Sequence, residues 1–169
     1  MTTLITGLIS GYVGGKLDLA SQRLLEILLS FPGLILATIF VVALGTGLHT
    51  VIIAIAITRI PASNRVVRSV VLSLKHADYV TAARVAGASP ARLMALHIAP
   101  QTIAPFLVVA SAHLGIAITS EAALSFLGIG VPPPSPSWGT MIGGAMASQF
   151  SPPWWLAVFP GLAISLTVF

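Results

Sequence analysis

Glu121 is the side chain whose chemistry is least expected from its surroundings. It lies in an apolar stretch, Ile103 to Leu127, that contains no other Asp, Glu, Lys or Arg. An ionisable group is costly to hold in such a segment, so Glu121 is a candidate site for a proton or a cation. We expect Glu121 and Ser125 to line a path for a solute. The alternative is that Glu121 is paired or hydrated near a membrane surface, because Gly128 ends the stretch ~10 Å further along a helix.

Other residue types that carry chemistry do not form a recognisable site. The four histidines are scattered and no two have a metal-binding spacing, and the chain contains no cysteine. The glycine-rich stretch GYVGGK lacks the phosphate-binding pattern, because Ser10 and Leu17 stand where that pattern needs glycine and Ser or Thr. The sequence therefore predicts no metal and no cofactor in this chain, and no catalytic residue.

The composition shows which solvent surrounds these residues. Hydrophobic residues make up 56% of the 169 residues and charged residues 7%, whereas soluble domains have about 25% charged residues. Lipid must therefore surround most of the chain. The sequence predicts an all-α fold, a polytopic helical bundle with about five hydrophobic spans, of which the first and last are partial.

Turns and charges divide the apolar sequence into these spans. The run between Glu26 and Arg59 has no charge and is too long for one crossing of ~20 residues, so we expect it to fold back at Gly45–Thr50. The span after this turn should leave the membrane near Arg59 and continue as a helix kinked at Pro61. The expected spans are residues 1–13 in part, Leu24–Leu44, a span from Val51, Ile103–Leu127 and Trp154–Phe169.

The basic residues orient the bundle. If the spans alternate, all of them fall on one side: Lys16 and Arg23 in the loop GGKLDLASQR, and the other six in residues 59–92. The positive-inside rule makes this side cytoplasmic. The loop 128–153 then lies outside. The net charge of +4 is thus a topology signal, and it gives no support to nucleic-acid binding.

The stretch Asp78–Pro100 has the signals of two short helices on the cytoplasmic side. Asp78 is a suitable N-cap and Gly87 a suitable left-handed residue after the helix. Ser89 and Pro90 then read as the N-cap and first residue of a second helix, which we expect to be interrupted at Pro100. The first helix is rich in alanine, so another protein could approach its backbone closely.

The same stretch resembles the membrane permease subunits of binding-protein-dependent ABC importers, in particular the C-type subunit of the dipeptide, oligopeptide and nickel group. The signature of that family is Glu-Ala-Ala, three residues, Gly, nine residues and an apolar run ending in Pro. Here it corresponds to Thr81-Ala82-Ala83, Gly87 and His97-Ile98-Ala99-Pro100. Four further stretches are similar to the same group: GYVGGKLD, FPGLILA, SEAALSFLGIGVPPPSPSWGTMI and FPGLAISLTV.

The resemblance implies a non-catalytic permease in the bacterial cytoplasmic membrane. Its partners would be a sister permease subunit, P-loop ATPase subunits that bind ATP and Mg²⁺, an extracytoplasmic substrate-binding protein and the lipid bilayer. The chain would be one transmembrane domain over residues 1–169, truncated at both ends relative to six spans, with residues 78–100 as the loop that couples to the ATPase. The coupling residues would be Asp78, Tyr79, Thr81, Ala82, Ala83, Arg84, Gly87, Ala88, Ser89 and Pro100.

Two points qualify this expectation. Thr81 stands where the family usually has Glu, which would have completed a capping box with Asp78 and offered a charge to the ATPase. The transported solute, whether dipeptide, oligopeptide or nickel, is not specified by these motifs. A secondary carrier or channel that uses Glu121, and a plain membrane anchor, are alternative functions, but neither needs a docking loop between two spans.

Overall fold

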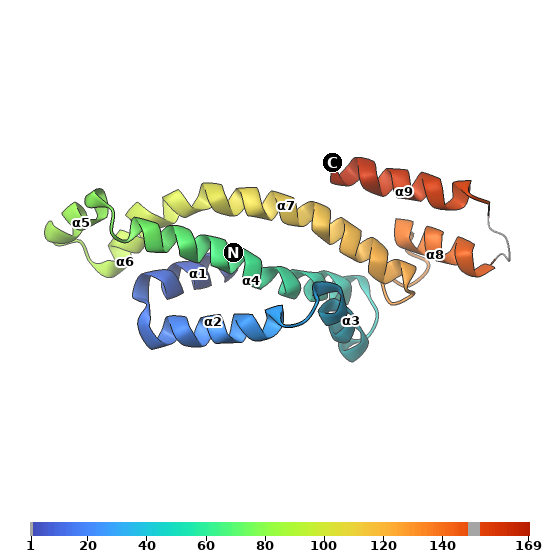
Figure 1. Ribbon diagram of the computed structural model, residues 1–169, viewed down its shortest axis with the longest axis horizontal. Helices are drawn as coiled ribbons and strands as arrows, with labels where there is room; N and C mark the ends of the chain where they lie inside the picture. The colour runs from blue at the N-terminus through green and yellow to red at the C-terminus, as the bar shows by residue number, and fades with distance from the viewer. Residues whose placement is uncertain (1, 149–152) are drawn as a thin grey trace. The chain divides into compact units, whose positions relative to one another are not determined.

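Helices are the only regular structure in the described residues, which are 2–148 and 153–169 of this computed structural model (Figure 1). The predicted all-α fold is confirmed. In chain order the elements are α1 Thr2–Val13, α2 Gly15–Leu29, α3 Gly33–Leu44, α4 Leu48–Leu74, α5 Asp78–Val85, α6 Pro90–Arg92, the π-helix η1 Leu93–Ile98, α7 Ala99–Phe126, α8 Trp138–Ser148 and α9 Trp155–Val168.

Two continuous helices of the described chain are long and apolar enough to cross a membrane, Leu48–Leu74 and Pro90–Phe126. A third span is obtained if α2 and α3, which meet at a bend, are counted together. The shorter apolar helices α1 and α9 correspond to the two partial spans expected at the ends of the sequence. The distribution of apolar segments is therefore the one that the sequence indicates.

The predicted span Leu24–Leu44 is wrong in its details. The chain is helical already from Gly15, inside the expected loop GGKLDLASQR, and the helix stops at Leu29. Pro32 is the N-cap of α3, with an extended ψ of 130°. Proline has no backbone N–H to continue a helix and forces the residue before it out of the helical region. The Phe31-Pro32 pair therefore breaks the expected single span into α2 and α3.

The helix continues past Pro61 as predicted, while the kink and the exit from the membrane there stay predictions; the interruption predicted at Pro100 is wrong. Pro61 lies inside α4, which continues past it for more than three turns. Pro100 does not interrupt the second loop helix either, because the chain from Pro90 to Phe126 is continuously helical. The wider π-turn of η1 precedes this proline, and the Ala99 N–H bonds the Met94 carbonyl five residues back. Such a turn is a known way to accommodate a residue that cannot join the regular ladder.

The expected outer loop 128–153 contains a helix that the sequence did not reveal. Helix α8 occupies residues 138–148, while residues 149–152 of this loop lie outside the described residues. Its sequence, WGTMIGGAMAS, contains three glycines, which are poor helix formers. The low helix propensity of this segment gave no indication of a helix, and tertiary contacts stabilise it instead.

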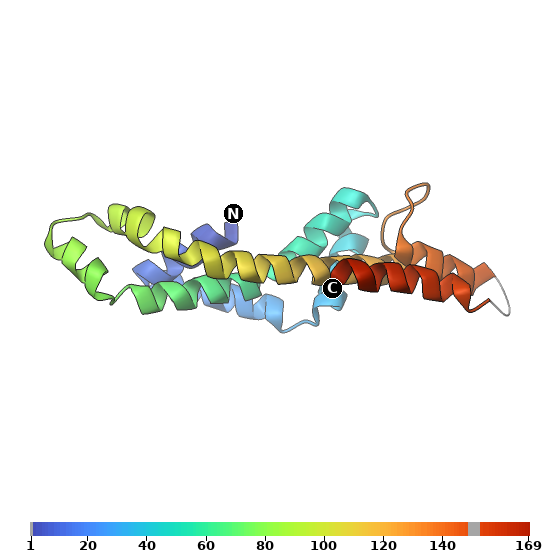
Figure 2. The same ribbon diagram turned by 90° about the horizontal axis from the view of Figure 1, so that it is seen from above.

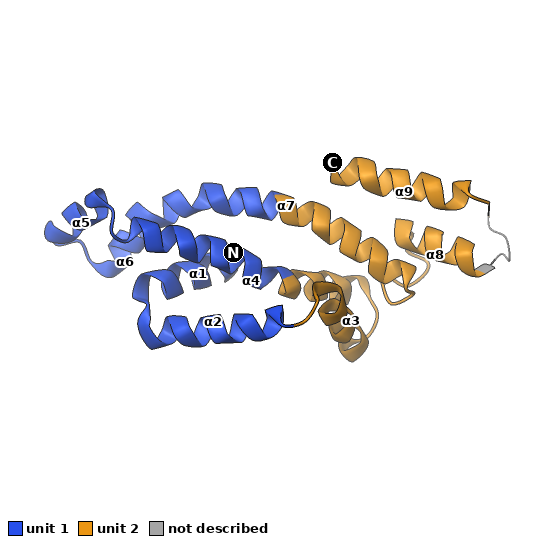
Figure 3. Ribbon diagram, viewed as in Figure 1, with its two compact units in different colours: residues 1–30, 59–111 blue, residues 31–58, 112–169 orange. Residues whose placement is uncertain are grey.

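Two compact units divide the chain (Figure 3). Unit 1 is residues 1–30 and 59–111, and unit 2 is residues 31–58 and 112–169. Each unit has its own core. In unit 1 the buried cluster is Leu8, Val67, Val71, Val80, Leu93 and Ile98. In unit 2 it is Ala37, Val41, Val51, Ala54, Ile55, Leu124 and Val131.

A pair of glycines brings α1 against α4 within unit 1. Gly7 and Gly11 are one helical turn apart, and a Cβ atom built on either would lie 3.0 Å from the side chain of Val67 or Val71 respectively. The absence of a side chain at both positions lets the two helices approach closely. Close approach matters in lipid, where helices associate by packing contacts because both solvent and side chains are apolar.

A second glycine pair with the same spacing joins α8 to α7 in unit 2. A Cβ on Gly139 would overlap the carbonyl of Ala122, and one on Gly143 would lie 2.7 Å from the carbonyl oxygen of Phe126. Ala122 and Phe126 are also one turn apart, so the backbones of the two helices run in contact over a full turn. This contact explains why the glycine-rich segment folds as a helix.

Adding one methyl group should test this contact. Gly143→Ala forces α8 away from α7, and overpacking of this kind costs about 1–3 kcal/mol. The neighbouring Gly144 has open space around it, so Gly144→Ala should be neutral or slightly stabilising, because alanine favours a helix. Unfolding of purified protein in mixed micelles with increasing denaturing detergent would compare the two variants. Equal stability of both would contradict the packing described.

Candidate functional site

One face of α5 is fixed to the core of unit 1. Val80 is completely buried and packs in the cluster that includes Val67, Val71 and Leu93. Ala83, three residues later on the same face, is partly buried against this cluster. Because residues three or four apart share a helix face, this spacing gives α5 a defined orientation. The helix is seated on unit 1 through its inner face.

The opposite face of α5 is open. Tyr79 is 43% exposed and Val85 84% exposed, and the residues between them add mainly small side chains. In both ribbon views α5 and the turn into α6 form the tip of unit 1 (Figures 1 and 2). The exposed residues of this segment are Asp78, Tyr79, Thr81, Ala82, Arg84, Val85, Ala86 and Gly87. We call this set the docking face, after the docking role that the sequence predicts for this loop.

Gly87 closes the C-terminus of α5 in the way that the sequence predicts. Its φ is +89°, in the left-handed region that favours glycine. The Gly87 N–H bonds the Arg84 carbonyl at 3.0 Å, and the Ala88 N–H bonds the Ala83 carbonyl at 3.1 Å. These two bonds define a Schellman motif, which satisfies the last carbonyls of the helix and reverses the chain. The tight turn between the two helices is therefore confirmed.

The caps at the starts of the two helices agree with prediction only in part. Ser89 caps α6 as expected, with its Oγ accepting from the Arg92 N–H at 3.4 Å and Pro90 in the first turn. Asp78 is not the N-cap of α5: Ala77 occupies that position, and no side chain caps the helix. Asp78 instead lies in the first turn, where its charge is favourable to the helix dipole.

The shift of the cap by one residue changes the interpretation of Thr81. With Ala77 as N-cap, the third helical position is Val80 rather than Thr81, and Val80 is buried. A glutamate at position 81 would therefore not complete a capping box with Asp78. Residue 81 is exposed on the docking face, so its role in coupling stays a prediction.

The remaining predicted coupling residues are not all in one place. Ala83 and Ala88 are partly buried against the unit 1 core, so their side chains support the loop from inside. Pro100 is exposed but lies in α7, beyond η1. Their roles in coupling stay predictions. Val80 and Leu93, the buried anchors of the loop, were not predicted. For Val80 the available signal is its apolar type among polar and small neighbours, whereas Leu93 lies among other large apolar residues and has no such signal.

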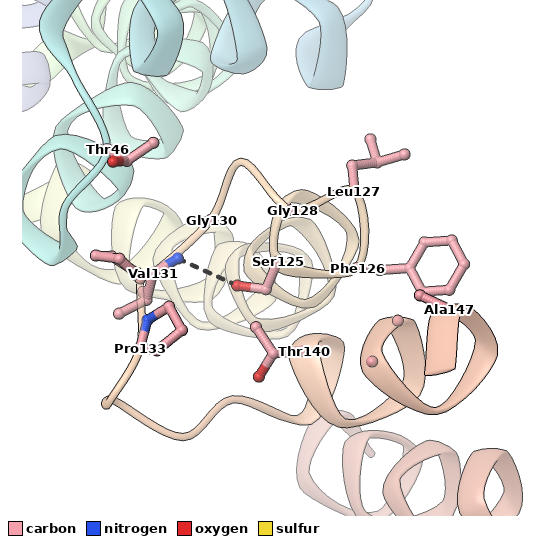
Figure 4. Close-up of a pocket in the computed structure, with 13 residues that line it drawn as sticks. Thr46, Ser125, Phe126, Leu127, Gly128, Gly130, Val131, Pro133, Thr140 and Ala147 are labelled. Carbon is pink, nitrogen blue, oxygen red and sulfur yellow. Dashed lines mark hydrogen bonds between the residues drawn. The ribbon is translucent and has the colours of Figure 1, made fainter. Parts of the chain in front are cut away.

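Glu121 and Ser125 lie one turn apart near the end of α7, in unit 2. The Ser125 hydroxyl donates to Glu121 Oε1 at 2.6 Å. The same hydroxyl accepts from the Val131 N–H at 3.3 Å (Figure 4). Ser125 is 2% exposed. This chain of two bonds ties the segment after Gly128 back onto α7. It is the paired arrangement that we gave as the alternative for Glu121, and a role in the solute path stays a prediction.

A cavity of about 490 Å³ lies beside this serine within unit 2 (Figure 4). Glycines, prolines and small side chains make up most of its wall, with hydroxyls from Thr46, Ser125 and Thr140. Glu121 is not among the residues that line it. The link between Glu121 and this cavity is its hydrogen bond with Ser125, whose hydroxyl it helps to orient.

In the described residues, helices long and apolar enough to cross a membrane, joined through an exposed short helix, are the features of an integral membrane protein. Comparison with known families supports this class and specifies it. The family described as binding-protein-dependent transport system inner membrane component matches residues 3–169, and the chain belongs to this family. The resemblance that the motifs indicated is thereby confirmed, including the expected location in the inner membrane.

The individual relatives of this chain are permease proteins of peptide and glutathione transport systems. The chain is 42% identical over 165 residues to a di/tripeptide transport system permease protein DppC of Pseudomonas aeruginosa, covering 98% of this chain and 54% of the relative. It is 41% identical over 167 residues to a dipeptide transport system permease protein DppC of Alkalihalophilus pseudofirmus, covering 99% and 54%. A glutathione transport system permease protein GsiD of Escherichia coli is 44% identical over 157 residues, covering 93% and 52%. The chain thus spans about half the length of these relatives.

The Schellman motif at Gly87 yields a direct prediction. A valine there must adopt a positive φ, which costs of order 1–3 kcal/mol, so Gly87→Val should increase amide exchange at the Gly87 and Ala88 positions and in the last turn of α5. Gly144→Val is the control, because Gly144 also has open space around it but has no positive φ. Hydrogen exchange followed by mass spectrometry would measure both. Unchanged protection in Gly87→Val would refute the assignment.

Proposed function

We propose that this chain is the membrane-embedded permease subunit of an ATP-driven importer for short peptides. It forms part of the translocation pathway together with a sister permease, while separate P-loop ATPase subunits bind ATP and Mg²⁺ and an extracytoplasmic binding protein delivers the solute. Its family membership and the names of its relatives, which are di/tripeptide, dipeptide and glutathione permeases, support this proposal.

The observation that carries the proposal is the two-sided construction of α5. Its inner face is held by Val80, which is fully buried, whereas its outer face exposes small residues, one aromatic ring and Arg84. A helix with alanines outward lets a partner surface approach the backbone. A helix held on one side and open on the other can receive a force from the partner without being displaced from its own subunit.

The position of α5 in the chain explains how such a force reaches the membrane. Only three residues separate α5 from α4, and a four-residue turn separates it from the continuous helix Pro90–Phe126. Both of these helices are long enough to span a membrane. Closure of two ATPases on ATP would therefore move the ends of both spans together, which is a rigid-body mechanism of alternating access.

A substitution on the docking face tests this function. Ala82→Leu adds bulk where the partner should approach, and misfit of this size, about 1–3 kcal/mol, should weaken retention of the ATPase by roughly fivefold or more. Ala62→Leu is the matched control, since Ala62 is also an exposed helical alanine but lies in α4. The measurement is co-purification of the ATPase with the tagged permease complex. Retention equal to wild type in Ala82→Leu would argue against docking through α5.

A further inference from the structure

Polar side chains fix α1 and α2 to α4 in unit 1. The strongest contact joins Asp18 of α2 to Arg68 of α4. Arg68 Nε donates to Asp18 Oδ1 at 2.7 Å and Arg68 Nη2 to Asp18 Oδ2 at 2.6 Å. The pair is bidentate, which fixes the geometry of both side chains. The side chain of Asp18 is only 14% exposed and that of Arg68 30%, so the pair is shielded from most of the screening that weakens surface ion pairs.

One turn before Arg68, Asn64 makes a second link. It is 1% exposed, accepts from Gln22 Nε2 at 3.2 Å and donates to Thr6 Oγ1 at 3.0 Å. Gln22 belongs to α2 and Thr6 to α1, so one buried amide connects three helices. A buried amide that lost these partners would be left unsatisfied, which is costly in a site without water.

Lys75 makes a third link, in the short segment between α4 and α5. It follows α4 directly, and its Nζ donates to the Tyr12 carbonyl near the end of α1 at 2.6 Å while lying 5.6 Å from the centroid of the Tyr12 ring. Lys75 is three residues before α5 begins. The link therefore ties the end of α1 to the segment that leads into the docking face.

The three links share one side of a helix. Asn64, Arg68 and Lys75 are spaced by four and seven residues, which places them along one face. Val67 and Val71, between them, receive the glycines of α1 and belong to the same buried cluster as Val80 of α5. Helix α5 and the three polar links are therefore attached to the same part of the chain, residues 64–75.

In α2 the polar side chains face inward and several large apolar side chains face outward. Its inner face carries Asp18 and Gln22, whereas Leu17, Leu24 and Ile27 are 65%, 67% and 60% exposed. Apolar contacts therefore do little to hold α2 against α4 along its first two turns. The ion pair and the amide link must supply the attachment.

We propose that Asp18 and Arg68 are positioning residues for the transmission of motion: their ion pair holds α2 to α4, so that α2 follows when the docking face moves. This inference rests on the proposed function and extends it from α5 to α2. Along the chain, α2 leads through the Phe31-Pro32 break into α3. Movement received by α5 would thus pass into a further apolar segment besides α4 and α7.

Covalent rescue in the assembled transporter tests the proposal. The chain contains no cysteine, so a double variant with Asp18→Cys and Arg68→Cys can be joined by a short thiol-specific cross-linker. Before cross-linking, we expect transported peptide per ATP hydrolysed to fall by about fivefold or more, with basal ATP hydrolysis unchanged. Cross-linking should restore the ratio, because the proposed role of the pair is to hold two helices together.

A charge swap and an internal control complete the experiment. Asp18→Arg and Arg68→Asp should each lower the transport ratio, and the combined variant should recover most of it. Arg23 and Glu26 form the control pair, because they bond at 3.1 Å within α2 and are exposed; Arg23→Ala should leave the ratio unchanged.

Three results would overturn the inference. These are a normal transport ratio in the uncross-linked double-cysteine variant, a ratio that stays low after cross-linking, and an equal loss in the Arg23→Ala control. Failure of the proposed function itself would be seen separately, as a wild-type complex that neither retains an ATPase nor transports peptide.

Discussion

Burial of Val80 in the core of unit 1 is the interaction that orients α5. A single buried side chain on α5, which lies in one cluster with Val67, Val71, Leu93 and Ile98, fixes which face of the helix looks outward. Burial of a valine contributes ~1.5–3 kcal/mol, and the Schellman motif at Gly87 adds the hydrogen bonds that keep the loop turned back on itself. The docking face follows from these two features.

Glycine pairs and polar links hold the helices on which this seat rests. In each unit a long helix packs against two glycines that are one turn apart on a neighbouring helix. Gly7 and Gly11 of α1 pack against α4, and Gly139 and Gly143 of α8 pack against α7. Lipid supplies no hydrophobic force between helices, so close backbone contact and buried hydrogen bonds are the available means of attachment. The pair Asp18–Arg68 and the chain Glu121–Ser125–Val131 are the polar counterparts of these glycines.

The sequence predicts those features that depend on local chemistry. Gly87 must be left-handed and Ser89-Pro90 must begin a helix, and both are confirmed because backbone preference alone decides them. The helix α8, which depends on contacts distant in sequence, was missed, and so were two local details, the cap at Ala77 and the π-turn that carries the helix through Pro100. The carboxylate of Asp18 finds its guanidinium 50 residues away, and no local pattern specifies that pairing. Glu121 was recognised as unusual, but its hydroxyl partner required the fold.

Cross-linking from two positions of α5 to the ATPase tests the central claim most directly. The chain has no native cysteine, and Val85 is 84% exposed whereas Val80 is fully buried on the opposite face. In the assembled complex, a cysteine at position 85 should form a product with the ATPase under a short-reach cross-linker, and a cysteine at position 80 should not. Absence of a product from position 85, or equal products from both positions, would contradict docking through the outer face of α5.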